Sequence, residues 1–163
     1  MNRLVLLTGG NLGQREAILA QAFELISRRV GAVTAYSPLI ESEPWGFESE
    51  HTFLNQVLIV HTELDAANVL QRIQKIEHEL GRERKNGRQW ISRNIDIDIL
   101  FFNDDIIETE KLIIPHKHLH QRRFTLYALD RIIPDYVHPV LKSRIHDLLK
   151  NCTDPSKVEE YHV

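Results

Sequence analysis

The order of extended and helical segments is the feature that most limits the fold of this chain. Apolar residues follow two different periods along it, and each period is typical of one kind of secondary structure. The extended segments are 3–8, 32–42, 53–64 and 93–100, and the helical segments are 14–30 and 65–80. This strand–helix–strand–strand–helix–strand order is that of a split βαβ unit. We therefore predict an α+β fold with a ferredoxin-like βαββαβ core, an antiparallel sheet with helices packed on it, and a C-terminal strand and helix addition.

Single residues mark the ends of several of these segments. Asp65 can cap the start of the second helix, and Gly81 follows its last apolar position. Pro38 cannot donate a main-chain hydrogen bond, so it favours a sheet edge or a bulge within 32–42. The stretch "TGGNLG" at 8–13 fits neither of the two glycine-rich nucleotide-binding patterns. We predict that it forms a tight turn from the first strand into the first helix.

Composition limits the kind of protein that this chain can be. With 163 residues, 42% of them hydrophobic, the chain is long enough for one domain with a substantial core, which we place at residues 1–163. A formal charge of −3 gives no general attraction to nucleic acid or to an anionic membrane. The one cysteine, Cys152, suits a reducing compartment, and the first residues lack the pattern of a signal peptide. We expect a cytoplasmic monomer whose polar residues after position 150 form a surface segment.

Two aspartates in the fourth extended segment, "RNIDIDIL", are unusual for a strand. Strand side chains alternate between faces, so Asp96 and Asp98 point to one face, about 7 Å apart, and the isoleucines point to the other. Like charges at this distance repel each other. A solvated outer face over a buried isoleucine face would explain the pattern, and so would a divalent cation beside the two carboxylates. The strand alone does not decide between these interpretations.

The second helix and the segment after it add groups that suit a phosphate chain. Gln74 and Glu77 lie three residues apart beside the apolar stripe of the helix, where an ordinary solvated face is the simpler interpretation. The cations that follow are Arg82, Arg84, Lys85, Arg88 and Arg93, with Trp90 among them. Arginine binds two phosphate oxygens at once, and carboxylates that bind Mg²⁺ beside such arginines are typical of a nucleoside triphosphate site. We predict that residues 82–92 form a lid over the triphosphate.

Three histidines alternate in "PHKHLH", after the aspartate strand. His116, His118 and His120 could bind zinc, but the segment lacks a cysteine partner and the H-E-x-x-H pattern. The simple alternative is that they are loop histidines. We favour a phosphate-binding role for His116, together with Lys111 before it and Arg122 after it.

Five motifs occur in one order along residues 3–140. They are "GGNLG", "FLN" at 53–55, "IEHELGRER" at 76–84, "SRNIDIDIL" at 92–100 and "IIPHKHLHQRRF" at 113–124. In this order they resemble the 6-hydroxymethyl-7,8-dihydropterin pyrophosphokinase family of folate biosynthesis, and the R-x-x-D-x-D-I-L and P-H-x(5)-R-x-F motifs together are highly specific. The resemblance implies transfer of the β,γ-pyrophosphoryl group of ATP to the pterin hydroxymethyl group, with two Mg²⁺ ions and release of AMP.

The resemblance also implies roles for individual residues. The catalytic set would be Asp96 and Asp98, which would bind both metal ions, with Arg82 and Arg93 of a mobile catalytic loop. The ATP-binding residues would be Gln74, Glu77, Arg84, Trp90, Arg93, Ile99, Lys111, His116 and Arg122. The pterin-binding residues would be Ser42, Pro44, Trp45, Phe53, Asn55, Trp90, Asp96 and Phe124, with Phe53 and Phe124 stacked on the ring.

Three positions depart from the family pattern. Gly10 replaces a common serine, Phe53 a frequent tyrosine and Lys111 an arginine. Phe53 keeps an aromatic face without the hydroxyl, and Lys111 keeps the charge without the planar fork of arginine. We expect these changes to alter affinity rather than the type of reaction.

Two functions of other classes share parts of this pattern. An RNA-recognition module has the same βαββαβ order, but "FLNQVLIV" lacks its aromatic strand motif and the net charge is negative. A metal-dependent phosphohydrolase could use Asp96, Asp98 and the histidines without any pterin. The nucleotide product of a reaction with ATP and the reduced pterin separates these three functions.

Overall fold

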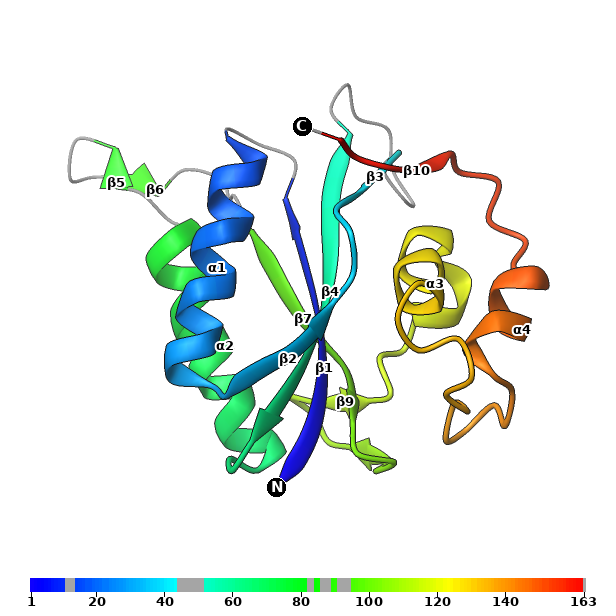
Figure 1. Cartoon of the computed structure of the whole chain (residues 1–163). Coiled ribbons are helices and arrows are strands. Elements are labelled where there is room, and N and C mark those ends of the chain that lie inside the picture. Colours follow the sequence, from blue (N-terminus) through cyan, green and yellow to red (C-terminus); the bar gives the residue numbers. More distant parts are fainter. Residues whose placement is uncertain (11–13, 44–51, 82–83, 86–88, 91–94, 163) are drawn as a thin grey trace.

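A central sheet runs through the molecule, with helices on both of its faces (Figure 1). The computed structural model describes residues 1–10, 14–43, 52–81, 84–85, 89–90 and 95–162. For 84–85 and 89–90 the description covers the main chain. Within this part of the chain, no helix is long and apolar enough to cross a membrane.

Six strands form the central sheet, and neighbours in it are antiparallel. They are β1 (Asn2–Gly10), β2 (Ala32–Tyr36), β3 (Ile40–Ser42), β4 (Phe53–Thr62), β7 (Asp96–Phe102) and β10 (Val158–Glu160). Their order is β10–β3–β4–β1–β7, with β2 also paired to β4. β2 and β3 are parts of one extended segment that is interrupted around Pro38, as the proline predicts. The β2–β3 segment, β4, β1 and β7 have the ferredoxin-like order, so the predicted fold class is confirmed.

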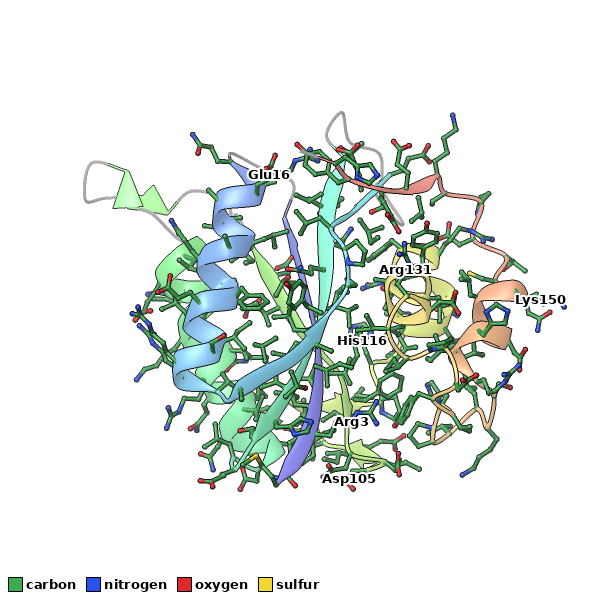
Figure 2. The ribbon with its side chains drawn as sticks, viewed as in Figure 1. Arg3, Glu16, Asp105, His116, Arg131 and Lys150 are labelled. Carbon is green, nitrogen blue, oxygen red and sulfur yellow. The ribbon has the colours of Figure 1, made fainter. Side chains whose placement is uncertain are left out.

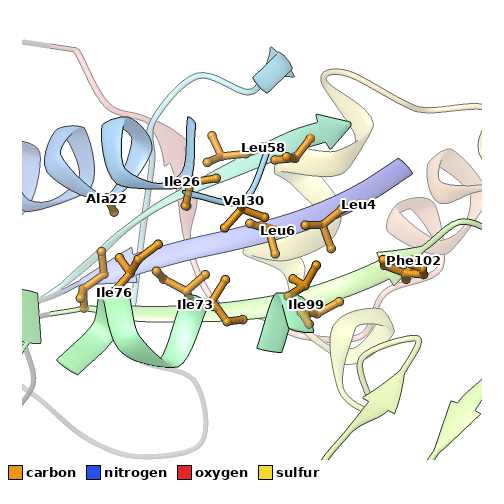
Figure 3. Packing of buried hydrophobic residues seen from close by; sticks show 14 of the residues in the cluster. Leu4, Leu6, Ala22, Ile26, Val30, Leu58, Ile73, Ile76, Ile99 and Phe102 are labelled. Atoms are coloured by element: carbon orange, nitrogen blue, oxygen red, sulfur yellow. The ribbon is translucent and has the colours of Figure 1, made fainter. Parts of the chain in front are cut away.

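The two predicted helices cover one face of the sheet. α1 (Arg15–Arg29) and α2 (Ala66–Gly81) pack on each other and on the strands (Figure 1). Asp65 caps α2 as predicted, because its Oδ1 accepts a hydrogen bond from the main-chain N–H of Asn68 at 2.8 Å. Even-numbered residues of β1 and β4 pack against the apolar faces of both helices. Together they form the first apolar cluster, part of which Figure 3 shows. Its nearly inaccessible members include Leu4, Leu6, Ile26, Leu58 and Ile73. Burial of each contributes roughly 1.5–3 kcal/mol.

A second group of helices covers the other face of the sheet. The short paired strands β8 (Ile107–Glu108) and β9 (Ile113–Ile114) precede a 3₁₀ turn at Leu119–Gln121, which leads into α3 (Arg123–Asp130). α4 (Ile145–Lys150) packs on α3 (Figure 1). Odd-numbered residues of β1 and β4 point to this side, and the second apolar cluster includes Val5, Leu7, Val57, Ile59, Leu126 and Leu129. The sheet therefore has an apolar core on each face.

One segment differs from its sequence prediction, and two others contain short strands. β1 continues through Gly9 and Gly10, so these glycines lie in a strand and not in the predicted turn; residues 11–13 lie outside the described part of the chain. The predicted lid, 82–92, contains two short paired strands, β5 (Arg84–Lys85) and β6 (Gln89–Trp90), and its other residues also lie outside that part. The segment after residue 150 supplies β10, which pairs with β3 at the edge of the sheet.

Candidate active site

The two aspartates lie on β7, which is an edge strand of the sheet. Ile97 and Ile99 are buried in the cluster on the side of α2, which packs on β7, whereas Asp96 and Asp98 point to the face that α3 covers. Asp96 is exposed at the end of this face, and Asp98 is half-buried. The interpretation as a solvated outer face is therefore wrong for Asp98, because its side of the sheet carries the second core.

A cavity of about 160 Å³ opens beside the aspartates. Its wall combines residues of β1, β4, β7 and the start of α3, which the sheet register and the second helical layer bring together. The lining residues are Leu7, Gly9, Glu43, Phe53, Asn55, Asp96, Asp98, Arg122 and Phe124. Four of them, Phe53, Asn55, Asp96 and Phe124, belong to the set that the sequence assigns to a pterin. We call this cavity the aromatic pocket.

Three residues on neighbouring strands form a row across the aromatic pocket. Gly9 of β1 is opposite Asn55 of β4 on one side and Asp96 of β7 on the other. Neighbouring strands are about 4.8 Å apart, so the row spans about 10 Å. A Cβ atom on Gly9 would lie 2.7 Å from Asn55 Oδ1, which is too short for an ordinary contact. The absence of a side chain at Gly9 thus keeps the space between the amide and the carboxylate open.

The side chain of Asn55 is held by residues of β3. Its Nδ2 donates to Ser42 Oγ at 3.0 Å and to the main-chain oxygen of Ile40 at 3.4 Å. Asn55 and Ser42 are both almost fully buried. These bonds leave Oδ1, on the Gly9 side, as the group that Asn55 presents to the aromatic pocket. Ser42 does not line this pocket, so its side chain acts there through Asn55.

Burial and a neighbouring arginine shift the pKa of the Asp98 carboxyl in opposite directions. Burial raises the pKa of the Asp98 carboxyl above its ordinary value, and the positive charge of Arg122 partly offsets this. Arg122 lines the same pocket, with its guanidinium carbon 5.9 Å from the centre of the Phe124 ring. The ionised Asp98 therefore lacks part of the stabilisation that it would have in water, and a bound cation would supply it.

His116 is neutral at physiological pH and directs one ring nitrogen towards Asp98. Burial, followed by the charges of Arg122 and His118, lowers the pKa of His116 to about 4. Its Nδ1 accepts a hydrogen bond from the main-chain N–H of His118 at 3.1 Å, so the neutral ring carries its proton on Nε2. Nε2 lies 3.9 Å from Asp98 Oδ2, which is beyond hydrogen-bond distance. His116 thus offers a hydrogen-bond donor beside Asp98 rather than a positive charge.

A second cavity, of about 300 Å³, also borders β7, and we call it the edge cavity. Three residues that the sequence assigns to ATP line it: Ile99, Lys111 and His116. Asp98 lines both the edge cavity and the aromatic pocket. Lys111 also lines a larger adjoining cavity of about 890 Å³, whose wall includes Gln74. Four of the predicted nucleotide residues therefore line these two adjoining cavities, and the edge cavity meets the aromatic pocket at Asp98. A fifth, Arg122, lines the aromatic pocket itself.

Glu77 has a contact that its position in the sequence does not reveal. The residue is 9% exposed, and its Oε2 accepts a hydrogen bond from the main-chain N–H of Ile97 at 2.8 Å. The simple expectation of a solvated helix face is wrong for Glu77, although it describes the exposed Gln74. Glu77 holds the backbone of β7 between the two aspartates, and its contact with ATP stays a prediction.

The carboxylates suit magnesium that is bound together with a substrate. Mg²⁺ is commonly held by one or two carboxylates, water and phosphate oxygens rather than by a complete protein cage. Asp96 and Asp98 supply two carboxylates in one pocket, and the described residues hold no cluster of three His, Cys, Asp or Glu side chains that could bind a metal. The same finding gives no support to zinc ligation by His116, His118 and His120.

Some predicted site residues lie outside the described part of the chain. The structure also adds site residues that the sequence does not predict. Those outside it are Pro44, Trp45, Arg82 and Arg93, together with the side chains of Arg84 and Trp90. The structure adds Leu7, Gly9 and Glu43 to the wall of the aromatic pocket. Alternation along β1 puts Leu7 and Gly9 on one face, but only the pairing with β4 and β7 places them beside the amide and the carboxylates.

The fold and the site together define a class of enzyme. A sheet edge carries two carboxylates that line an aromatic pocket, and one of them, Asp98, also lines a cavity that holds a lysine and a neutral histidine. Carboxylates for a hard cation, donors for phosphate oxygens and a pocket for a flat ring are the parts of a metal-assisted phosphoryl-transfer enzyme.

Comparison with known sequences identifies the family. The sequence matches the 7,8-dihydro-6-hydroxymethylpterin-pyrophosphokinase (HPPK) family over residues 5–134. It is 41% identical over 133 residues to the 2-amino-4-hydroxy-6-hydroxymethyldihydropteridine pyrophosphokinase of Porphyromonas gingivalis, covering 80% of this chain and 90% of that protein. For the protein of the same name from Bacillus subtilis the identity is 41% over 125 residues, covering 76% of this chain and 74% of that protein. This chain belongs to the HPPK family.

Two solved structures with the same fold come from longer proteins. A crystal structure of HPPK-DHPS in complex with substrates has a TM-score of 0.74 and 18% identity, covering 91% of this chain and 43% of that chain. Plasmodium falciparum HPPK-DHPS with pteroate has a TM-score of 0.75 and 20% identity, covering 91% and 42%. These similarities concern the fold, and this chain spans less than half the length of those proteins.

Membership of the family sets the class of reaction. The chain is a transferase of the pyrophosphokinase type in folate biosynthesis. The RNA-recognition module and the metal-dependent phosphohydrolase are therefore not favoured.

Proposed function

We propose that this chain transfers pyrophosphate from ATP to the hydroxymethyl group of 6-hydroxymethyl-7,8-dihydropterin, with the pterin in the aromatic pocket and the triphosphate along the edge cavity. The observation that carries this assignment is the position of Asp98, which lines both cavities. A ring in one cavity and a phosphate chain in the other would meet at this carboxylate. Family membership supports the same pair of substrates.

In this proposal the aromatic pocket orients the pterin. Phe53 and Phe124 stack on the flat ring, since both line the pocket and aromatic faces bind such rings well. Asn55 Oδ1 accepts a hydrogen bond from an N–H group at the ring edge, while Ser42 fixes the amide. Because Gly9 has no side chain, the Asn55 amide can keep this orientation towards the ring edge.

The edge cavity and the two aspartates act on the phosphate chain. Asp96 and Asp98 would hold two Mg²⁺ ions, which would neutralise the negative charge that develops during the transfer. Lys111 and the Nε2–H of His116 bind phosphate oxygens, and Arg122 adds positive charge next to the carboxylates. Arg82, Arg84, Trp90 and Arg93 are proposed to complete the nucleotide site from outside the described residues.

In this proposal the two substrates meet for one displacement at phosphorus. The pterin hydroxymethyl oxygen forms a bond to the β-phosphorus of ATP, and the bond from that phosphorus to the oxygen bridging the α-phosphate breaks. The leaving oxygen stays on AMP, and the hydroxyl proton is released. Because both substrates are held in orientation beside Asp98, the bimolecular reaction becomes effectively unimolecular.

The nucleotide product tests the proposed reaction. When the protein is incubated with MgATP and the reduced pterin alcohol, we expect AMP and the pterin diphosphate in equal amounts, because transfer occurs at the β-phosphorus. Chromatography of the nucleotides, with a reaction lacking the pterin as control, measures this. Accumulation of ADP, or AMP formation without the pterin, would contradict the proposal.

The Gly9→Ala substitution should weaken pterin binding. The new methyl group would collide with Asn55 Oδ1, so the amide must turn away from the ring edge. We expect the pterin dissociation constant, measured calorimetrically with a non-hydrolysable ATP analogue present, to rise about tenfold, or about 1.4 kcal/mol. In an Asn55→Ala background the same substitution should have little further effect, because its collision partner is gone. Equal losses in both backgrounds would remove Asn55 from the explanation.

We further propose that residues 1–163 form one pyrophosphokinase domain, which acts as a cytoplasmic monomer without nucleic-acid or membrane partners. A formal charge of −3 supports the absence of such partners. Light scattering after size-exclusion chromatography, at the protein concentration of the activity assay, measures the oligomeric state.

A further inference from the structure

We propose that residues 157–161, which contain β10 and which we call the β10 segment, position the walls of the aromatic pocket, with Tyr161 and Arg15 as positioning residues. The proposal rests on the proposed pterin site. The β10 segment lies beyond residues 5–134, the part of the chain that matches the family. It nevertheless reaches the pocket wall by three separate routes.

The first route runs through the sheet to Asn55. Val158 of β10 pairs with Ser42 of β3, and Ser42 Oγ accepts the hydrogen bond from Asn55 Nδ2. β3 has only three residues and lies between β10 and β4. Without β10 it would be a short edge strand, and such strands are weakly held. Pairing with β10 therefore fixes the residue that orients the pocket amide.

The second route runs through the main chain to Glu43. The N–H of Glu43 donates to the carbonyl oxygen of Lys157 at 3.4 Å, directly before β10 begins. Glu43 lines the aromatic pocket. A single hydrogen bond thus connects the β10 segment to a second part of the pocket wall.

The third route runs through side chains to Phe53. Tyr161 donates from its hydroxyl to Glu16 Oε1 at 2.6 Å, and the guanidinium carbon of Arg15 lies 5.5 Å from the centre of the Tyr161 ring. Arg15 donates to the main-chain oxygen of Thr52 at 3.2 Å and to its Oγ1 at 2.9 Å. Thr52 directly precedes Phe53, a pocket residue. Figure 2 labels Glu16 near the start of α1, at the top of the view. β10 lies at the same end of the molecule in Figure 1.

Arg15 also joins this cluster to β3. Its second terminal nitrogen donates to Glu41 Oε2 at 2.8 Å, and the Thr52 hydroxyl donates to the same oxygen at 3.1 Å. Arg15, Glu41, Thr52 and Tyr161 therefore connect the start of α1, β3, the start of β4 and the β10 segment. None of the ATP-assigned residues whose side chains the structure describes takes part in these contacts. Loss of the cluster should therefore affect the pterin more than the nucleotide.

The experiment compares Tyr161→Ala and Arg15→Ala with the unaltered protein. The pterin dissociation constant is measured with a saturating non-hydrolysable ATP analogue, and the affinity for that analogue is measured separately. We expect each substitution to weaken pterin binding about five- to tenfold, and analogue binding less than twofold. Because both residues act in one cluster, the double variant should lose less than the product of the two single effects.

Controls separate positioning from general stability. His162→Ala changes the exposed neighbour of Tyr161 and should leave both affinities unchanged. Tyr161→Phe keeps the ring beside Arg15 and should restore most of the pterin affinity. If Tyr161→Ala does not fold, Arg15→Ala decides the question by the same criterion.

Two results would overturn the proposal. One is unchanged pterin affinity in folded Tyr161→Ala and Arg15→Ala, and the other is an equal loss for pterin and nucleotide. An unaltered protein that binds no pterin would instead contradict the proposed function, so the two failures are distinguishable.

Discussion

Replacing Asp96 or Asp98 by asparagine should lower kcat by about three orders of magnitude, a loss of about 4 kcal/mol of transition-state stabilisation. The amide keeps the shape of the carboxylate and removes the charge that would hold the metal ions. Both side chains line the aromatic pocket, and Asp98 also lines the edge cavity. Steady-state kinetics with saturating MgATP and pterin measure the effect. Near-normal turnover of either variant would reject the assignment.

The same variants should show that the aspartates serve function rather than stability. Burial raises the pKa of Asp98, so its ionised form lowers the free energy of unfolding at pH values above its ordinary pKa. The neutral Asp98→Asn side chain avoids this cost, and the metal-free melting temperature should stay unchanged or rise. Magnesium with an ATP analogue should stabilise the unaltered protein but not this variant.

A matched control removes a carboxylate far from the site. Glu63 is exposed. It follows the last residue of β4, whereas Phe53 is the first residue of that strand. Glu63→Gln changes the net charge by the same amount as Asp98→Asn and should leave kcat unchanged. A comparable loss in both variants would point to a general charge effect instead of metal binding.

The Phe124→Leu substitution should weaken pterin binding about ten- to a hundredfold, because stacking on an aromatic side chain is worth roughly 1–3 kcal/mol. Phe124 belongs to the second apolar cluster and also lines the aromatic pocket. Leucine retains much of the apolar volume but lacks the flat face. Calorimetry with the pterin and, separately, with an ATP analogue measures the two affinities, and the analogue should bind as before.

A core residue of the same helix provides the control for Phe124. Leu129 lies on α3, is fully buried and does not line the aromatic pocket. Leu129→Ala should lower the free energy of unfolding by about 2–5 kcal/mol without a selective effect on the pterin. If Phe124→Leu instead weakened both ligands equally, packing in the core would be the better account of Phe124.

Local patterns in the sequence determined the order of the elements and the face of the aspartates. Periods of two and of 3.6 residues report which side of a strand or helix is buried, and this information is contained in neighbouring residues. Asp65 at the start of α2 and the interruption at Pro38 follow from single residues in the same way. The "RNIDIDIL" segment therefore predicted both the buried isoleucines and the side that holds Asp96 and Asp98.

The tertiary structure decided which residues meet across the sheet. Gly9 lies between Asn55 and Asp96 only through the register of β1 with β4 and β7, and register joins segments more than forty residues apart. The contact of Glu77 with β7 likewise depends on how α2 packs on an edge strand. The polar residues after position 150 predict a surface segment, and the place of β10 beside β3 results from hydrogen bonds of the main chain. Such bonds hardly depend on side-chain type, and so the sequence alone could not assign their partners.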